Sequence, residues 1–305
     1  MKKLTILLIF LISTPTFAAS FRILTIRSDQ SLFAKQLFAG FSSSTPEKVI
    51  AFDYYGENGR VLSRKVKEIN PDLVLTIGEL PIYTSISDFP SIPFLISNFQ
   101  SSNLENRSNV ILINHSISVS QKISMLKFLF PDLKTIGTVY DPIYSKNEFE
   151  EFALAATKLN LKVLSIKVSS DKEIGSFVQG FKDKIDAYYY ISDATTDTDN
   201  AQSTLFEFLH AQGIPSLSSN YTHTTKGAFM TIAPDPILLG EKTWSFAHKI
   251  LQEGKITSRS IYLNDDEYIL TLSMAACEKF SLTPQMTVDF TKQATQKGWK
   301  VFWQK

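Results

Sequence analysis

The chain has 305 residues, of which 44% are hydrophobic, and its 31 Lys and Arg nearly balance its 30 Asp and Glu. This apolar fraction is enough for a packed core, so a chain disordered as a whole is excluded, and the length fits two domains or one large one. The near-zero charge disfavours a nucleic-acid-binding protein, which needs an excess of Lys and Arg, and a single Cys excludes an internal disulfide and a cysteine-rich metal site.

The N-terminus has the order of a secretory signal peptide. Lys2 and Lys3 precede an apolar run over residues 4–12, and small and polar residues then lead to Ala18. Such a run is too short to cross the roughly 30 Å of hydrocarbon in a membrane. We therefore predict that residues 1–18 are a signal peptide and that the mature protein is periplasmic or secreted, with an uncleaved anchor as the alternative.

Short apolar runs alternate with helical patterns through the rest of the chain. The runs are continuous rather than alternating with polar residues, which is typical of strands buried on both faces by crossover helices. The first half has runs at 21–26, 49–54, 72–78, 92–96 and 109–113, and the second half repeats the order at 134–140, 161–168, 186–191 and 214–218. The repeat predicts two βαβ-built domains of like topology.

Capping and tail patterns complete the expected elements. Ser145 and Ser170 each precede a Glu by three residues, which predicts two capping boxes at helix starts. A long helix is expected over 236–252, with Pro at its first turn and Gly254 after its end. The runs 261–263 and 268–272 are expected to form a hairpin.

Polar residues follow the expected strands. In open parallel sheets, ligands bind beyond the carboxyl ends of the strands, so these residues are the candidate binding site. They are Ser28, Asp29, Gly78, Glu79, Ser97, Asn98, Asp141, Tyr144, Ser145, Asp193, Thr195, Asn220 and Asp235. The set suits a small polar ligand, with an ammonium that meets a carboxylate and an apolar part that meets Tyr144 or Tyr221. The alternative for each Asp or Ser is a helix cap.

Catalytic and metal-binding motifs are not found. The sequence has no Gly-x-Ser-x-Gly elbow, no His-Glu-x-x-His pair and no phosphate-binding P-loop. His223 is expected to be a solvated loop histidine. We therefore predict no enzyme, no cofactor and no metal site, although a triad built from distant residues stays an alternative.

Several stretches of the second half carry a resemblance to a known family. The chain resembles the substrate-binding proteins of ABC transporters, in the group with a type I periplasmic-binding-protein fold that includes tryptophan- and phenylalanine-binding members. The stretches are 133–145, 185–195, 213–220, 226–228, 235–240 and 270–284, and the first hundred residues fit loosely.

The resemblance carries over to single positions. Asp141 and Ser145 fall in the family's loop after the first strand of the second domain. Asp193 and Thr195 stand where the family usually shows Asp-Asn-Thr, with Ala194 in place of the middle residue. Asn220 stands where Asp is common, Asp235 keeps its place at a crossover, and Glu79 replaces a small residue.

The resemblance implies an α/β fold of two Rossmann-like parallel-sheet domains joined by a three-strand hinge near residues 116, 237 and 258. The N-terminal lobe would be 19–116 plus 237–258, and the C-terminal lobe 117–236 plus 259–305. The implied function is a solute-binding protein that captures a small polar or amino-acid-like ligand by hinge closure for a membrane permease. The alternative is a periplasmic sensory subunit that signals to a membrane receptor. In either case we expect a monomer that binds no nucleic acid.

Overall fold

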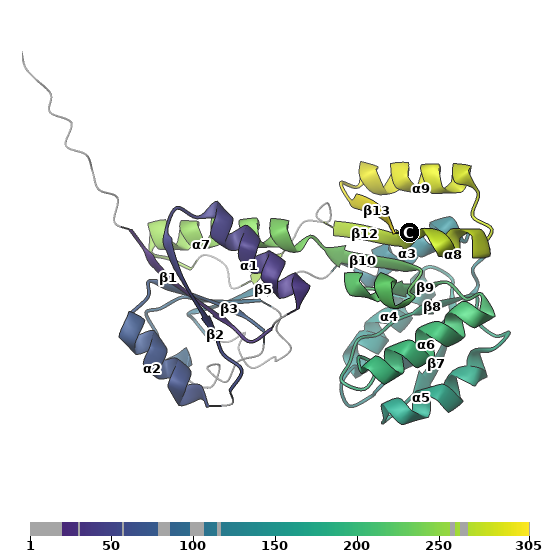
Figure 1. The fold of residues 1–305 in the computed structure, drawn as a ribbon, viewed down its shortest axis with the longest axis horizontal. Helices are drawn as coiled ribbons and strands as arrows, with labels where there is room; N and C mark the ends of the chain where they lie inside the picture. The colour runs from purple at the N-terminus through teal and green to yellow at the C-terminus, as the bar shows by residue number, and fades with distance from the viewer. Residues whose placement is uncertain are drawn as a thin grey trace, which may run out of the picture. The chain divides into compact units, whose positions relative to one another are not determined.

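The protein is an α/β structure with two sheets (Figure 1). The structure is a computed structural model, and it describes residues 20–29, 31–56, 58–78, 86–97, 107–114, 117–256, 260–262 and 268–304. The predicted signal peptide, Glu79 and Asn98 lie outside these residues. Contacts separate the chain into two compact units, with the described parts of 1–29, 45–111 and 247–259 in one and of 30–44, 112–246 and 260–305 in the other. The predicted lobe boundaries stay a prediction, because residues 116 and 258 are outside the described part.

One sheet has six strands among the described residues. In spatial order they are β11 (Ser260–Tyr262), β5 (Val110–Asn114), β4 (Phe94–Ser97), β3 (Leu73–Ile77), β1 (Arg22–Arg27) and β2 (Lys48–Asp53). The pairings of β1 with β2 and β3, of β3 with β4 and of β5 with β11 are parallel. The helices α1 (Leu32–Ser44) and α2 (Gly59–Ile69) follow β1 and β2 in the chain, as the crossovers of a parallel sheet require.

The other sheet has seven strands in the described part of the chain. In spatial order they are β13 (Lys300–Gln304), β12 (Tyr268–Ser273), β10 (Met230–Pro234), β9 (Ser216–Ser218), β8 (Ala187–Tyr189), β6 (Thr135–Tyr140) and β7 (Lys162–Lys167). The pairings from β10 to β7 are parallel, and β12 is antiparallel to β10. The prediction of an α/β fold with two parallel-sheet domains is confirmed.

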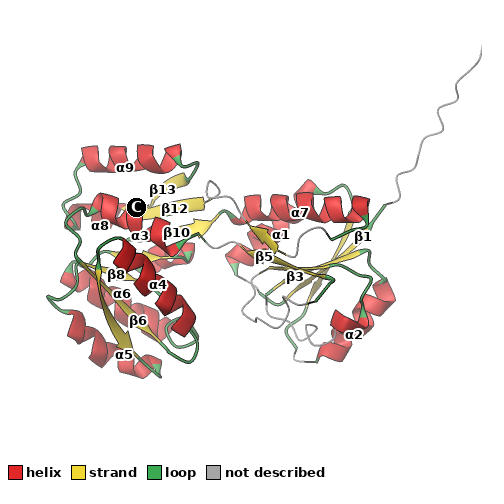
Figure 2. Ribbon diagram, turned by 180° about the vertical axis from the view of Figure 1, so that it is seen from behind, coloured by secondary structure: helices red, strands yellow, loops and turns green. Residues whose placement is uncertain are grey.

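Helices cover both faces of the seven-stranded sheet (Figures 1 and 2). They are α3 (Val119–Leu129), α4 (Lys146–Lys158), α5 (Asp171–Phe177), α6 (Asp199–Gln212), α8 (Met274–Lys279) and α9 (Pro284–Gln296). On one face Tyr189 stacks on Phe152 of α4, and on the other Tyr190 stacks on Phe206 of α6. Neighbouring tyrosines of one segment thus fill two cores, which explains its unbroken apolar run.

Two helices approach each other closely at a pair of glycines. The helix α7 (Pro236–Glu253) contacts α1, and a Cβ atom on Gly240 would lie 2.1 Å from the carbonyl oxygen of Leu37. A Cβ atom on Gly40 would likewise lie 2.1 Å from the carbonyl oxygen of Ile237. Glycine is therefore required at both positions by the close approach of the two backbones.

The predicted hairpin near the C-terminus is wrong. β11 pairs with β5 in the six-stranded sheet, whereas β12 pairs with β10 in the seven-stranded sheet. A two-stranded hairpin is barely stable in water, and each short run gains more by extending a sheet that already exists. Sequence proximity suggested the hairpin, but it carries no information on which sheet edge a strand joins.

Candidate functional site

The loops after β6 and β8 bring four of the predicted site residues together. Asp141, Ser145, Asp193 and Thr195 are all nearly buried and are linked by hydrogen bonds. Tyr144, on the same loop as Asp141, is 63% exposed. This group lies at the carboxyl edge of the seven-stranded sheet, where the sequence predicted a ligand.

Asp193 is the centre of this group. Its Oδ2 atom accepts hydrogen bonds from the backbone N–H of Asp141 at 2.9 Å and from the Ser145 hydroxyl at 2.6 Å. Its Oδ1 atom accepts from the N–H groups of Thr195 at 2.9 Å and Thr196 at 2.8 Å. Four donors therefore hold this buried carboxylate, and through it the two loops are fastened to each other.

The same contact corrects the prediction of a capping box at α4. Ser145 precedes the helix, but its side chain makes no capping hydrogen bond. The hydroxyl instead donates to the Asp193 carboxylate, and the carbonyl oxygen of Asp141 lies 3.1 Å from it. A hydrogen bond that the hydroxyl donates to a charged carboxylate is stronger than one that it accepts from a neutral backbone N–H in a capping box, so the tertiary contact prevails.

The carboxylate of Asp141 accepts fewer hydrogen bonds than the carboxylate of Asp193. Its Oδ1 atom accepts from the N–H of Ile143 at 2.9 Å, and its Oδ2 atom accepts from the hydroxyl of Thr195 at 2.7 Å. A carboxylate has about four acceptor sites, so further donors can be accommodated. Of the two aspartates, Asp141 is the one that is chemically suited to meet a ligand.

Asn220 and Asp235 serve local structure. Asn220 accepts from the N–H of Thr222 at 3.0 Å and begins a 3₁₀ turn, η5 (Tyr221–Lys226). Asp235 accepts from the N–H groups of Ile237 and Leu238 at the start of α7, and its second oxygen pairs with Lys300. Both side chains have the contacts that the helix-cap alternative describes.

The predicted residues of the six-stranded sheet lie where β1, β3 and β4 end. The Ser28 N–H donates to the carbonyl of Ile77 at 3.0 Å, and the Gly78 N–H donates to that of Ser97 at 3.2 Å. Gly78 has φ +96°, and a Cβ atom there would lie 2.5 Å from the Ser28 hydroxyl, so the turn requires glycine. The Ser97 hydroxyl is buried and has no hydrogen-bond partner among the described residues. Asp29 directly follows Ser28.

Lys122, beside the seven-stranded sheet, was missed by the sequence analysis. It belongs to α3 and is 6% exposed, and its ammonium donates to the Ser219 hydroxyl at 2.7 Å. The ammonium also lies 5.6 Å from the centre of the Tyr189 ring. A signal was present, because Lys122 occupies the apolar stripe of its helix between Val119 and Leu126, where a charge is unexpected.

Glu148 of α4 was also missed. Its pKa is raised to about 7: burial is the main cause, the positive charge of Lys122 opposes the rise, and the nearby carboxylates Glu151, Asp193 and Asp197 add to it. Its charge therefore changes near neutral pH.

The prediction of a solvated His223 is wrong. The imidazole is fully buried, its Nδ1 atom lies 2.8 Å from the Ser218 hydroxyl, and its Nε2 atom lies 3.2 Å from the Gln202 amide nitrogen. Burial lowers its pKa to about 4, with a smaller effect of Lys226, so the ring is neutral at pH 7. Ser218 is also buried, so this serine–histidine contact offers no surface to a substrate.

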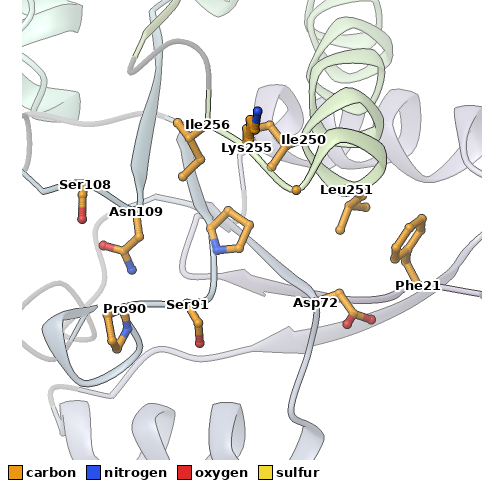
Figure 3. A pocket seen from close by; sticks show the side chains of 12 residues that line it. Phe21, Asp72, Pro90, Ser91, Ser108, Asn109, Ile250, Leu251, Lys255 and Ile256 are labelled. Carbon is orange, nitrogen blue, oxygen red and sulfur yellow. The ribbon is translucent and has the colours of Figure 1, made fainter.

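A further cavity lies at the opposite end of the strands, in the six-stranded sheet. It has a volume of about 700 Å³ and is lined by Phe21, Asp72, Pro93 and Asn109, each of which directly precedes a strand of the six-stranded sheet, and by the end of α7 (Figure 3). The side chain of Asp72 accepts from the Arg22 N–H at 2.7 Å. The amide of Asn109 donates to two backbone carbonyls. These two polar side chains of the cavity thus form hydrogen bonds with the protein's own backbone.

The described residues contain no group of three or more His, Cys, Asp or Glu that could hold a metal ion. No helix within them is long and apolar enough to cross a membrane.

Comparison with known proteins decides the family. A family model described as ABC transporter substrate binding protein matches residues 57–285. The chain belongs to this family. The substrate-binding family model thus covers every loop at the carboxyl edge of the seven-stranded sheet discussed above, and it confirms the resemblance seen in the sequence. No curated protein matches the chain.

Solved structures of substrate-binding proteins share this fold. An ABC domain in complex with L-Trp from Streptococcus pneumonia has a TM-score of 0.67 at 18% identity, with 93% of this chain and 100% of that one covered. The ligand-free, open structure of CD0873, a substrate-binding protein with adhesive properties from Clostridium difficile, has a TM-score of 0.75 at 18% identity, with the same coverage of 93% and 100%. A periplasmic ribose ABC transporter protein from Conexibacter woesei has a TM-score of 0.60 at 12% identity, covering 88% of this chain and 97% of that one. At such identities the likeness shows the fold alone.

Proposed function

We propose that this protein is the exported solute-binding subunit of an ABC transporter and captures a small polar or amino-acid-like ligand. The observation that carries the proposal is the match of a substrate-binding family model to residues 57–285. The nearly buried polar group around Asp141, at the carboxyl edge of a parallel sheet, supports it, because ligands of such sheets bind there.

Hinge closure would make capture selective. A ligand held by the loops of one lobe gains contacts with the other lobe when the two close, so it shifts the equilibrium towards the closed form. The shift can be no larger than the difference between the ligand's affinities for the two forms. A membrane permease that recognises the closed form would then select loaded protein over empty protein.

Export rests on the N-terminal sequence. The proposed signal peptide at 1–18 would be removed, and the mature chain would begin at Ala19. Intact-mass measurement of protein secreted by a bacterial host tests this point, because an uncleaved anchor would leave the full mass and a membrane-bound protein.

A thermal-shift screen of residues 19–305 tests the binding function. A ligand that binds the folded state raises its melting temperature by mass action, so a shift confined to one class among amino acids, nucleosides, sugars and organic ions would support solute binding. Folded protein that no compound stabilises would contradict it. The sensory alternative has the same binding step and a different partner, so pull-down of a permease or of a receptor by loaded protein separates the two.

A further inference from the structure

We infer that Lys122 is the anchor for an anionic group of the ligand and that the ligand is therefore a small carboxylate. The inference rests on the proposed solute-binding function and extends it by naming a specificity-determining side chain and a ligand class. The observations behind it are the burial of Lys122, its neighbours and the state of the carboxylates around it.

The position of Lys122 places its ammonium at the ligand-binding edge of the sheet. Ser219, which accepts its hydrogen bond at 2.7 Å, directly follows the last residue of β9. Tyr189, whose ring lies 5.6 Å away, is the last residue of β8. The ammonium is therefore beside the ends of two neighbouring strands, at the same edge as Asp141 and Asp193.

A buried ammonium needs more than these contacts supply. Removing a charge from water costs several kcal/mol unless it is paired, and an ammonium has three donors. Within the described residues, Lys122 donates to one hydroxyl and faces one ring, and no carboxylate oxygen lies within the 4.0 Å of an ion pair. Two donors are thus left without a protein acceptor in the described part of the chain.

The nearby carboxylates do not compensate for this charge by direct contact. Both oxygens of Asp193 are occupied by four donors from its own loops. The charge of Lys122 lowers the pKa of Glu148, but the two side chains form no ion pair among the described residues. The Tyr189 hydroxyl is buried as well, and it has no hydrogen-bond partner in this part of the structure. An ammonium with two unused donors and a phenol hydroxyl with no acceptor are suited to a carboxylate, which accepts from both.

Three variants and paired compounds test the inference. Lys122→Met removes the charge at similar length, Lys122→Arg keeps it, and Lys127→Met is the matched control, because Lys127 lies on the same helix and donates to the carbonyl of Leu159 at 2.7 Å. The probes are the twenty amino acids, acetate, succinate and 3-phenylpropionate, each beside its carboxamide, together with the sugars and nucleosides of the first screen. The rise in melting temperature identifies the class of compound that binds, and calorimetry measures the affinity of each variant for that compound.

The expected result is that carboxylates bind and carboxamides do not. Lys122→Met should lose about 10- to 100-fold in affinity, Lys122→Arg should recover part of it, and Lys127→Met should bind as the parent does. The melting temperature of Lys122→Met without ligand should not fall, because the variant removes a buried charge. A lower melting temperature with unchanged affinity would show that Lys122 is structural.

The remaining outcomes separate the inference from the proposed function. Equal binding of a carboxylate and its carboxamide, equal affinity in Lys122→Met, or binding of sugars or nucleosides alone would overturn the inference and leave solute binding intact. Folded parent protein that binds none of the compounds would overturn both.

Discussion

The Asp193 carboxylate accepts a hydrogen bond of 2.6 Å from the hydroxyl of Ser145 and thereby joins the loop after β8 to the start of α4. Two residues separated by 48 positions in the chain are held by one charged hydrogen bond, and three further bonds fix the same carboxylate. Asp193 thus has a structural role, whatever its part in ligand binding.

Asp193→Ala should destabilise the protein. Four donors would lose their acceptor, so we expect a loss of about 3 kcal/mol in the free energy of unfolding, measured by urea denaturation. Asp199→Ala is the control, because the Asp199 side chain is 96% exposed and its ion pair with Lys226 contributes little. Equal stability of both variants would show that the bonds to Asp193 are not needed for the fold.

Asp141→Ala should mainly weaken ligand binding. The carboxylate has acceptor capacity left, so the loss of one charged hydrogen bond to a ligand would cost about 1–3 kcal/mol of binding free energy. Calorimetry with a compound found in the screen measures it. Unchanged affinity in both Asp141→Ala and Asp193→Ala would remove these residues from the site.

His223 should make the protein less stable in mild acid. Its folded-state pKa of about 4 lies below the unfolded value of 6.5, so the unfolded chain takes up a proton first as the pH falls. Stability is full above pH 6.5 and is lost as the pH falls towards 4, by about 3 kcal/mol for this group. Urea denaturation between pH 4 and 7 should show a flatter profile for His223→Gln than for the parent. Parallel profiles would contradict the assignment.

Gly240→Ala should be strongly destabilising. The added Cβ atom would meet the Leu37 carbonyl at 2.1 Å, so α1 and α7 must separate, at a cost of about 3 kcal/mol or more. Gly175→Ala is the matched control in a helix, because its Cβ atom would lie 3.5 Å from Thr204 in ordinary contact and should stabilise α5 by about 0.5–1 kcal/mol. Thermal denaturation of both variants distinguishes a steric effect from a general effect of alanine.

The sequence predicted the fold better than it predicted single side chains. Continuous apolar runs identified the strands because crossover helices bury both faces, as the neighbouring Tyr189 and Tyr190 show. The strands that β11 and β12 pair with could not be predicted, since each choice depends on which sheet edge is open after the rest has folded. A short turn such as the one that holds His223 shows no periodicity in the sequence, so the burial of its side chains is decided by tertiary contacts.

The candidate site shows the same division. Parallel topology placed Asp141 and Asp193 at one edge, and the structure brings them within one hydrogen-bond network. Which oxygen atoms are already occupied depends on contacts between distant loops, and the sequence does not show this. Lys122 was missed because it lies on a helix that precedes the sheet rather than in a loop that follows a strand.

The network around Asp193 also affects the thermodynamics of binding. The loops after β6 and β8 are fastened by the chain's own donors and acceptors, so their conformational entropy is lost when the protein folds. A ligand that binds them would not have to order them, and less of its interaction energy is spent on rearrangement. Preorganised loops of this kind favour affinity for compounds that offer few contacts, such as a small carboxylate.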